Sequence, residues 1–163
     1  MSDNIDIFAR LKQDHDRQRV LLDKLEQTHG DSDDRRTWFE QFTIDAKSHA
    51  AAEEQALYST MMRKPETTDK PRHSVAEHHE IEEALNDIAA TDMSSGAWLI
   101  KFKELKHRYL HHIEEEEDEH FPDFAKFLTE EDTRHMRTVF ERRKKEEKAE
   151  AEVTPEKKDD AKE

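Results

Sequence analysis

The sequence predicts an all-α protein, built as an antiparallel four-helix bundle with an additional helix at its C-terminal end. Three observations support this. The 163 residues include only 2 glycines and 4 prolines. Apolar residues make up 33% of the chain and recur at the three- and four-residue spacing of helices with one buried face. The connections between the helical segments are short, so consecutive helices should pack as up-down-up-down neighbours.

Five helical segments follow from this periodicity and from the residues that begin and end helices. The predicted segments are Asn4–His29, Asp34–Arg63, Pro71–Ala90, Ser95–His120 and Glu130–Lys148. Gly30 directly follows the first segment, and Asp34 can cap the second. Pro65 and Pro71 bracket a linker before the third segment.

The fourth and fifth segments have equally clear signals. Ser94 or Ser95 can cap the fourth, and Pro122 is expected to end it. Thr129 followed by Asp132 is typical of a capping arrangement at the start of the fifth. From about Lys144 the chain is almost wholly charged, and it cannot bury enough apolar surface to order itself. We therefore expect one helical domain over residues 1–145 and a disordered charged tail over residues 146–163.

Composition excludes several classes of function. The formal charge of −14 opposes nucleic-acid binding, which needs clustered Lys and Arg, and favours cations as ligands. The chain has no cysteine, which excludes disulfides, thiolate metal sites and thiol catalysis. No apolar run approaches the roughly 18 residues of a membrane span, and the N-terminus lacks the apolar core of a signal peptide. We expect a cytoplasmic protein without a membrane or nucleic-acid partner.

The sequence contains an internal repeat with a shift of 63 residues and no gap. The matched pairs are His15 with His78, Leu22 with Leu85, Leu25 with Ile88, Phe39 with Phe102, His49 with His112, Glu53 with Glu116 and Glu54 with Glu117. Histidines, glutamates and apolar positions therefore move together. The simplest explanation is two related helical hairpins that face each other across a pseudo-twofold axis.

Each of the first four helices directs one histidine into the predicted bundle. On the bundle-facing sides, where apolar residues recur every three or four positions, lie His15, His49, His78 and His112. The two adjacent pairs of histidines can be separated on this basis. His79 and His111 fall on polar faces, about 100° around the helix from their neighbours.

Two glutamates accompany these histidines and require a partner. Glu53 follows His49 by four residues and Glu116 follows His112 by four, so each pair shares one helix face. Burial of an ionised carboxylate without a partner costs several kcal/mol, and no Lys or Arg lies on the same faces. A pair of divalent cations, each with two imidazoles and both bridged by the carboxylates, would resolve this. The predicted metal ligands are His15, His49, Glu53, His78, His112 and Glu116.

Nitrogen and oxygen ligands without thiolate suit iron or manganese, and zinc is an alternative. The competing structural explanation is a set of core histidines hydrogen-bonded to buried acids. A ferritin-like carboxylate site is a second competitor, because Glu26 with His29 and Glu117 with His120 form E-x-x-H patterns. The first pattern lies at a helix end, and Glu117 lies off the predicted inward face, so we do not favour it.

The segments "DHDRQRVLLDKL", "HAAAEEQALY", "EHHEIEEAL" and "HIEEEEDEHFP", in this order, resemble the hemerythrin-like HHE cation-binding domain. The closing "FLTEEDTRHMRTVFERRKK" resembles the last helix of that family, so the resemblance covers roughly residues 4–145. It implies a four-helix bundle with a non-haem di-iron centre, bridged by carboxylates and by an oxo or hydroxo group. The family's ligand positions fall on the same six residues.

Two departures from the family bear on function. Oxygen-carrying hemerythrins have an extra histidine where this chain has Ser74, and an aspartate five residues after the last histidine, where this chain offers Glu116 at four. A dedicated oxygen carrier is therefore not expected. The favoured interpretation is a binding protein whose di-iron site meets O2, NO or peroxide in sensing, storage or stress response. The alternatives are a di-iron enzyme acting on peroxide, and an iron buffer or regulator. We assign no catalytic residue.

Overall fold

The computed structural model describes residues 5–151, which are helical throughout apart from short connections, with no strand in that range. The α-helices are α1 (Ile7–Glu26), α2 (Asp33–Glu53), α3 (Ser59–Met62), α4 (Asp69–Ala89), α5 (Gly96–Glu115), α6 (Phe121–Ala125) and α7 (Glu130–Ala151). Two π-helical turns, η2 (Glu54–Tyr58) and η4 (Glu116–His120), and one 3₁₀ turn, η3 (Pro65–Thr67), lie between them.

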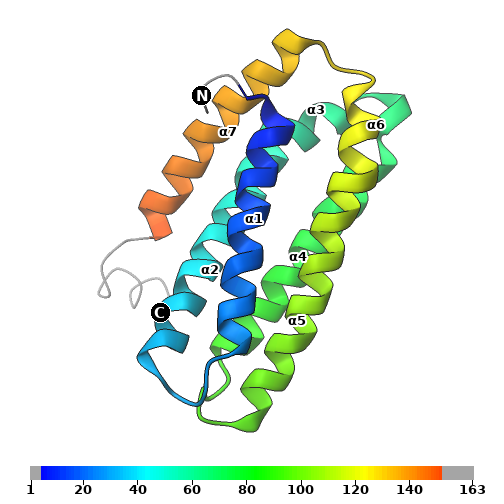
Figure 1. The fold of residues 1–163 in the computed structure, drawn as a ribbon. Coiled ribbons are helices and arrows are strands. Elements are labelled where there is room, and N and C mark those ends of the chain that lie inside the picture. The colour runs from blue at the N-terminus through cyan, green and yellow to red at the C-terminus, as the bar shows by residue number, and fades with distance from the viewer. Residues whose placement is uncertain (1–4, 152–163) are drawn as a thin grey trace, which may run out of the picture.

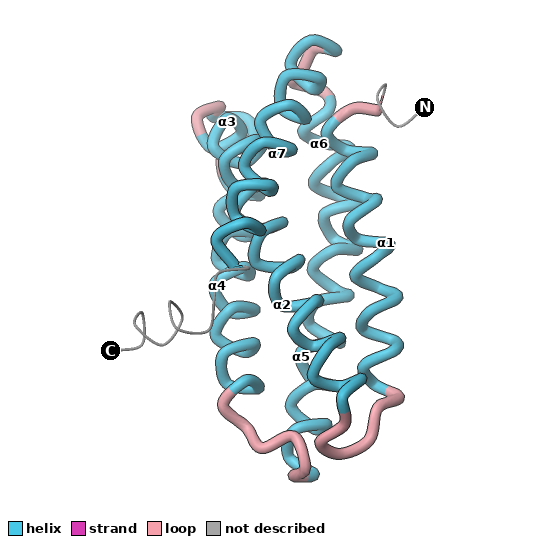
Figure 2. Tube along the Cα trace, turned by 90° about the vertical axis from the view of Figure 1, so that its left-hand side faces the viewer, coloured by secondary structure: helices cyan, strands magenta, loops and turns pink. Residues whose placement is uncertain are grey.

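Helices α1, α2, α4 and α5 form an antiparallel up-down-up-down bundle (Figure 1). Short loops join the helices at the lower end of the bundle (Figure 2). Helix α7 lies outside the bundle and packs across α1 and α2, as both views show. The predicted all-α bundle with an additional C-terminal helix is confirmed.

Local chemistry accounts for where the helices begin. The side chain of Asp6 accepts a hydrogen bond from the Ala9 N–H at the start of α1, and Ser32 caps α2 in place of the predicted Asp34. Gly30 supplies the positive φ of 58° that the turn after α1 requires. Before α7, Thr129 and Asp132 form reciprocal bonds between side chain and backbone, as expected from their spacing.

Two long helices contain a π-helical turn at the position of a predicted ligand. In the first, η2 begins directly after Glu53, and in the second, η4 begins at Glu116. The prediction that Pro122 ends the helix is wrong, because α6 continues to Ala125. Proline disrupts a regular α-helix by removing an N–H donor, and here the π turn has already altered the hydrogen-bond ladder immediately before it.

The C-terminal helix is longer than the sequence predicted. Helix α7 runs to Ala151, so the first six residues assigned to the charged tail, 146–151, are helical. Lys144, where fraying was expected to begin, is only 5% exposed because its ammonium group is bound by buried carboxylates. The remainder of the predicted tail, residues 152–163, and Asn4 of the first predicted helix lie outside the described residues.

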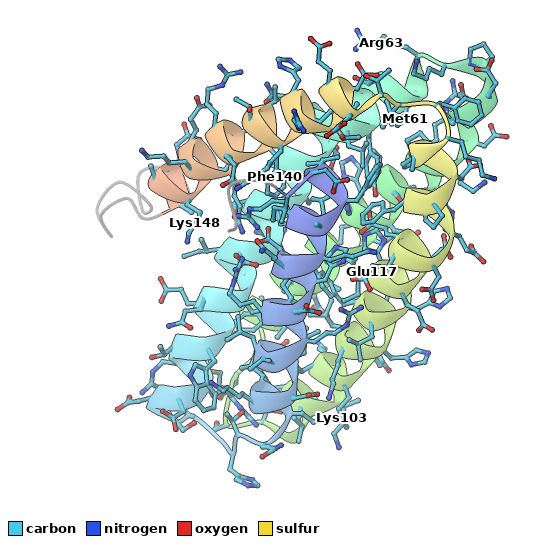
Figure 3. All side chains as sticks on the ribbon, turned by 45° about the horizontal axis from the view of Figure 1, so that its top comes forward. Met61, Arg63, Lys103, Glu117, Phe140 and Lys148 are labelled. Carbon is cyan, nitrogen blue, oxygen red and sulfur yellow. The ribbon has the colours of Figure 1, made fainter. Side chains whose placement is uncertain are left out.

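The apolar core is divided into two clusters. One lies toward the loop end of the bundle and includes Leu22, Phe42, Trp98 and Phe102. The other includes Leu11, Leu57, Tyr58 and Phe124, together with Phe140 of α7. Figure 3 shows Phe140 on the side of α7 that faces the bundle. Along each long helix, the predicted ligands lie in a polar layer between these two clusters.

No helix within residues 5–151 combines the length and the apolar character that a membrane crossing requires.

Candidate metal centre

The six predicted ligands converge in the polar layer of the bundle. They form two overlapping groups in which ligand-type atoms all lie within 4.8 Å of one another: His15, His49, Glu53 and Glu116 in one, and Glu53, His78, His112 and Glu116 in the other. None of the six is more than 9% exposed. Both glutamates belong to both groups, which is the arrangement expected of carboxylates shared between two cations.

The polar atoms at the centre of this cluster lack hydrogen-bond partners. Both carboxylate oxygens of Glu53 and of Glu116 are buried and unpaired, and so are Nε2 of His15 and of His49. The four histidine Nε2 atoms lie 3.2 to 3.9 Å from a carboxylate oxygen of Glu53 or Glu116. Unpaired buried polar groups cost free energy and are rare. A pair of divalent cations fits this donor set, because it would satisfy these atoms together.

The other ring nitrogen of each histidine is held by a carboxylate. The contacts are His15 Nδ1 to Glu117 at 2.7 Å, His49 Nδ1 to Asp14 at 2.8 Å, His78 Nδ1 to Glu54 at 2.9 Å and His112 Nδ1 to Glu77 at 2.8 Å. An ionised carboxylate can only accept, so Nδ1 carries the hydrogen in each case. The lone pair of Nε2 is then directed at the centre, which is the state a metal ligand needs.

These supporting carboxylates follow the internal repeat as well. Asp14 and Glu77 are 63 positions apart, as are Glu54 and Glu117. Figure 3 labels Glu117 on the chain after α5, where it faces α1. This role of Glu117 was not predicted from the sequence, where Glu117 was considered as part of an E-x-x-H pattern and placed off the inward face. The repeat contained the signal, because Glu54 and Glu117 were among the matched pairs.

Burial and mutual repulsion shape the charge of the central carboxylates. Burial, reinforced by the charge of Glu53, raises the pKa of Glu116 well above its usual range. Burial acts on Glu53 in the same direction, but His78 and His49 outweigh it and lower its pKa. Without a cation between them, the two carboxylates therefore cannot both ionise at low cost. A bound cation would allow both to be charged.

The surroundings shift the pKa values of the central histidines in opposite directions. Burial would lower the pKa of His78, but the Glu53 and Glu54 carboxylates outweigh it and raise the pKa to about 9. His15 and His112 are instead shifted toward the neutral form.

Burial lowers the pKa of His15, although its hydrogen bond to Glu117 acts in the opposite direction. Burial lowers the pKa of His112 in the same way, against the effect of Glu77. A neutral imidazole is the form that binds a metal, so the environments of His15 and His112 favour coordination over protonation.

Helix α7 supplies a buried cation to Asp14, which supports His49, and to the neighbouring Asp45. Lys144 Nζ lies 2.7 Å from Asp14 and 3.1 Å from Asp45. Burial would raise the pKa of Asp14, but His49, Lys144 and Arg10 hold it well below the usual range. Because Asp14 positions His49, the additional helix is connected to the centre through one carboxylate.

Aromatic rings enclose the centre on the side of the second apolar cluster. Phe121 stacks on His15 with centroids 6.1 Å apart, and Tyr58 lies 5.9 Å from His78. Phe140 of α7 contacts His49 edge-on at 5.7 Å. These rings fix the imidazole planes and exclude water from that side.

The opposite side opens into a cavity of about 660 Å³, lined by α2, α4, α5 and α7. His49, His78, His112 and Glu116 all line it. Small residues of α2, Ala46 and Ala50 among them, leave this space between α2 and α4. A small molecule could therefore reach the centre from solvent without displacing the apolar core.

The exposure of His79 and His111 agrees with the polar faces predicted for them, whereas the burial of His120 was not predicted. His79 and His111 are exposed on the outside of α4 and α5. His29 lies in the exposed connection after α1, and Glu26 instead pairs with Lys106, so the first ferritin-like pattern forms no site. The second is also not one unit: Glu117 binds His15, whereas His120 is buried and bonded to Ser74.

The fold and this cluster define a class of protein: a helical bundle with a buried histidine and carboxylate centre suited to cations. Comparison with known proteins agrees. Residues 6–124 match the family model described as hemerythrin HHE cation binding domain. The chain belongs to this family.

Two relatives extend the comparison. An uncharacterized hemerythrin-like protein of Schizosaccharomyces pombe is 30% identical over 120 residues, which cover 71% of this chain. The match spans only 58% of the length of that relative. The crystal structure of a hemerythrin HHE cation binding domain-containing protein from Mycobacterium kansasii matches with a TM-score of 0.79 and 18% identity, covering 90% of this chain and 89% of that one. At this identity the likeness establishes the shared fold.

Proposed function

We propose that this protein holds two iron ions in the bundle and exposes them to a small ligand, O2, NO or peroxide, in sensing, storage or stress response. The observation that carries the proposal is the set of unpaired carboxylate oxygens and imidazole nitrogens at the centre. The repeat gives each ion two histidines and a share of both glutamates. Two histidines with carboxylate oxygen and open positions are typical of non-haem iron sites.

His15 and His49 would hold one ion, His78 and His112 the other, and Glu53 and Glu116 would bridge them. When bound, such a pair supplies open coordination positions and redox chemistry. The chain itself contributes the rest. Four carboxylates fix the hydrogen on each Nδ1, the aromatic rings exclude water on one side, and the cavity admits a ligand on the other.

Metal content and optical spectra test this proposal. Purified protein should contain about two ions per chain by elemental analysis, with iron ahead of manganese and zinc. The near-ultraviolet absorption of the protein in air should change when azide or NO is added. One ion per chain or none, or a spectrum that neither ligand alters, would contradict the proposal.

A catalytic version of the same function is favoured by the size and openness of the cavity, which allow a substrate and its product to exchange. Addition of peroxide to metal-loaded protein distinguishes an enzyme from a binding protein. An enzyme would consume it repeatedly and would lose this turnover in Glu116→Ala. A binding protein would respond once, with a spectral change that is stoichiometric with the chain.

A further inference from the structure

A second group of histidines and carboxylates lies beside the centre, nearer to solvent. Its members are His73 and Glu77 of α4, Glu115 at the end of α5, and His120 of η4. Ligand-type atoms of His73, Glu77 and Glu115 lie within 4.8 Å of one another, and so do those of Glu115, Glu119 and His120. We call His73, Glu77, Glu115 and His120 the outer cluster.

Two imidazoles of the outer cluster converge on one oxygen atom. Nε2 of His73 lies 2.9 Å from Oε1 of Glu115, and Nε2 of His120 lies 3.2 Å from the same oxygen. A carboxylate oxygen of Glu77 is 3.5 Å from Nε2 of His73. Nitrogen and oxygen atoms bound tetrahedrally to one ion at about 2.0 to 2.2 Å are roughly 3.4 Å apart. These three contacts are already near that spacing, and Glu115 joins the two groups in which the members of the outer cluster lie.

His120 is positioned in the same way as the histidines of the centre. Its side chain is only 3% exposed, and its Nδ1 is hydrogen-bonded to Oγ of the buried Ser74 at 3.0 Å. Its other nitrogen is thereby aimed at Glu115. The π turn η4 contributes to this geometry, because bonding from residue i to residue i+5 brings positions 115 and 120 to the same side of the helix.

The first half of the repeat shows that the fold does not require polar residues here. The positions 63 residues before His73, Ser74, Glu115 and His120 are Arg10, Leu11, Ala52 and Leu57. Leu11, Ala52 and Leu57 are fully buried in an apolar cluster. The second half thus has a buried serine and a buried histidine at the positions where the first half has leucine. Buried polar groups cost free energy, so packing alone does not explain them.

The two halves also differ in how they neutralise their carboxylates. In the first half Arg10 binds Asp14 at 2.6 Å, and Lys144 binds it at 2.7 Å. In the second half, within residues 5–151, the ion pairs of Glu77 and Glu115 are with histidines alone. The first half therefore contains its own cations, whereas the second half offers imidazole nitrogens and carboxylates.

We propose that the outer cluster is a third metal site, which takes one divalent first-row transition-metal ion. Its ligands would be Nε2 of His73 and of His120 and the carboxylates of Glu77 and Glu115. Imidazole with carboxylate suits zinc, iron, cobalt or nickel better than calcium or magnesium. Because Glu77 also holds Nδ1 of His112 at 2.8 Å, the outer ion and the centre share one carboxylate.

Binding of Co²⁺ to the full chain, with the centre already loaded, tests this site. Equilibrium dialysis with elemental analysis should show one additional Co²⁺ per chain. His73→Ala removes a half-exposed side chain, and His120→Leu copies the first half of the repeat, so both should fold. Loss of a residue that only hydrogen-bonds to a metal ligand lowers metal affinity by roughly 10- to 100-fold. Because His73 and His120 are proposed as ligands themselves, each variant should lower the affinity for Co²⁺ by more than this. The exposed His79→Ala is the matched control and should bind as the wild type does.

Absence of the additional ion in the wild type would overturn the proposal. So would unchanged affinity in His73→Ala or His120→Leu, which would show that Glu115 only contacts these histidines and that they bind no metal. The outer site does not depend on the function proposed for the centre. In the double variant His49→Ala, His78→Ala, which lacks one histidine ligand of each central ion, one Co²⁺ should still bind. If the wild type held that ion and no others, the di-iron proposal would fail and the outer site would stand.

Discussion

Asp14 and Glu77 stand at equivalent positions in the two halves of the bundle, and each accepts a hydrogen bond of 2.8 Å from Nδ1 of an inward histidine. The partner of Asp14 is His49, and that of Glu77 is His112. The repeat therefore extends from the predicted ligands to the groups that orient them.

Loss of a supporting carboxylate should weaken metal binding without abolishing it. In Glu117→Gln the contact with Nδ1 of His15 remains in place, but the negative charge is lost. We expect two ions per chain with about 10- to 100-fold lower affinity, measured by competition with a chelator. Asp118→Asn, one residue further on and exposed, serves as the control. Equal affinity in both variants would contradict the role given to Glu117.

The adjacent histidines should respond in opposite ways. His78→Ala and His112→Ala should lose most of the bound metal, because both side chains are inward. His79→Ala and His111→Ala should keep about two ions, since these exposed imidazoles would need a helix rotation of about 100° to reach the centre. Elemental analysis of the four variants decides this. The reverse pattern would mean that the helical register is wrong.

Removal of metal should destabilise the fold. Ions present at 100 times their dissociation constant add about 2.7 kcal/mol to the free energy of unfolding. For a chain of this size that corresponds to roughly 5 to 10 °C in melting temperature. Calorimetry of chelator-treated and reconstituted protein measures the difference. Identical melting temperatures would argue that Glu53 and Glu116 are satisfied without metal, against their unpaired oxygens.

Lys144 should contribute strongly to stability. Lys144→Met keeps the length of the side chain but leaves Asp14 and Asp45 without their buried ammonium group. Removal of one member of a buried ionic group costs about 3 to 5 kcal/mol, and Arg17, which binds both carboxylates, should keep the loss near the lower end. Urea unfolding measures it. Lys145→Met, at the next and exposed position, should change stability little.

Acid should abolish the contribution of Asp45 to the stability of the fold. Burial raises its pKa, but Lys144 and Arg17 together with the Gln18 hydrogen bond outweigh this and lower it below the ordinary 3.8. A lowered pKa means that the ionised group stabilises the fold fully above about pH 5, and that this stability is lost as the pH falls further. The stability difference between wild type and Asp45→Asn should therefore shrink between about pH 5 and pH 2. If the stability difference stayed constant over this pH range, ionisation of Asp45 would not be its cause.

The fold and the six central positions were predictable, because helical periodicity and the 63-residue repeat depend only on the order of residue types. The six residues lie together as the periodicity required, and their binding of metal stays a prediction. The π turns were not predictable. A π turn holds more residues than the 3.6 of an α-helix, so the inward face read from a regular period is displaced after Glu53 and Glu116. This displacement buries His120.

The behaviour of α7 was also hidden in the sequence. Its residues around Lys144 are almost all charged, and composition alone indicates a segment that cannot pack. The binding partners of Lys144 are 130 and 99 positions away in the chain, in α1 and α2. Pairings at such separations leave no local pattern, so burial of this lysine could be found only in three dimensions.

Helix α7 packs on only one half of the bundle, and this affects the order in which metal ions would bind at the centre. It packs against α1 and α2 and brings Lys144 to Asp14, where Arg10 and Arg17 already lie. On the other side Glu77 meets only imidazoles among the described residues. A cation entering between His15 and His49 therefore faces more positive charge than one entering between His78 and His112. Two ions with matching ligands would load in sequence, the His78 and His112 position first.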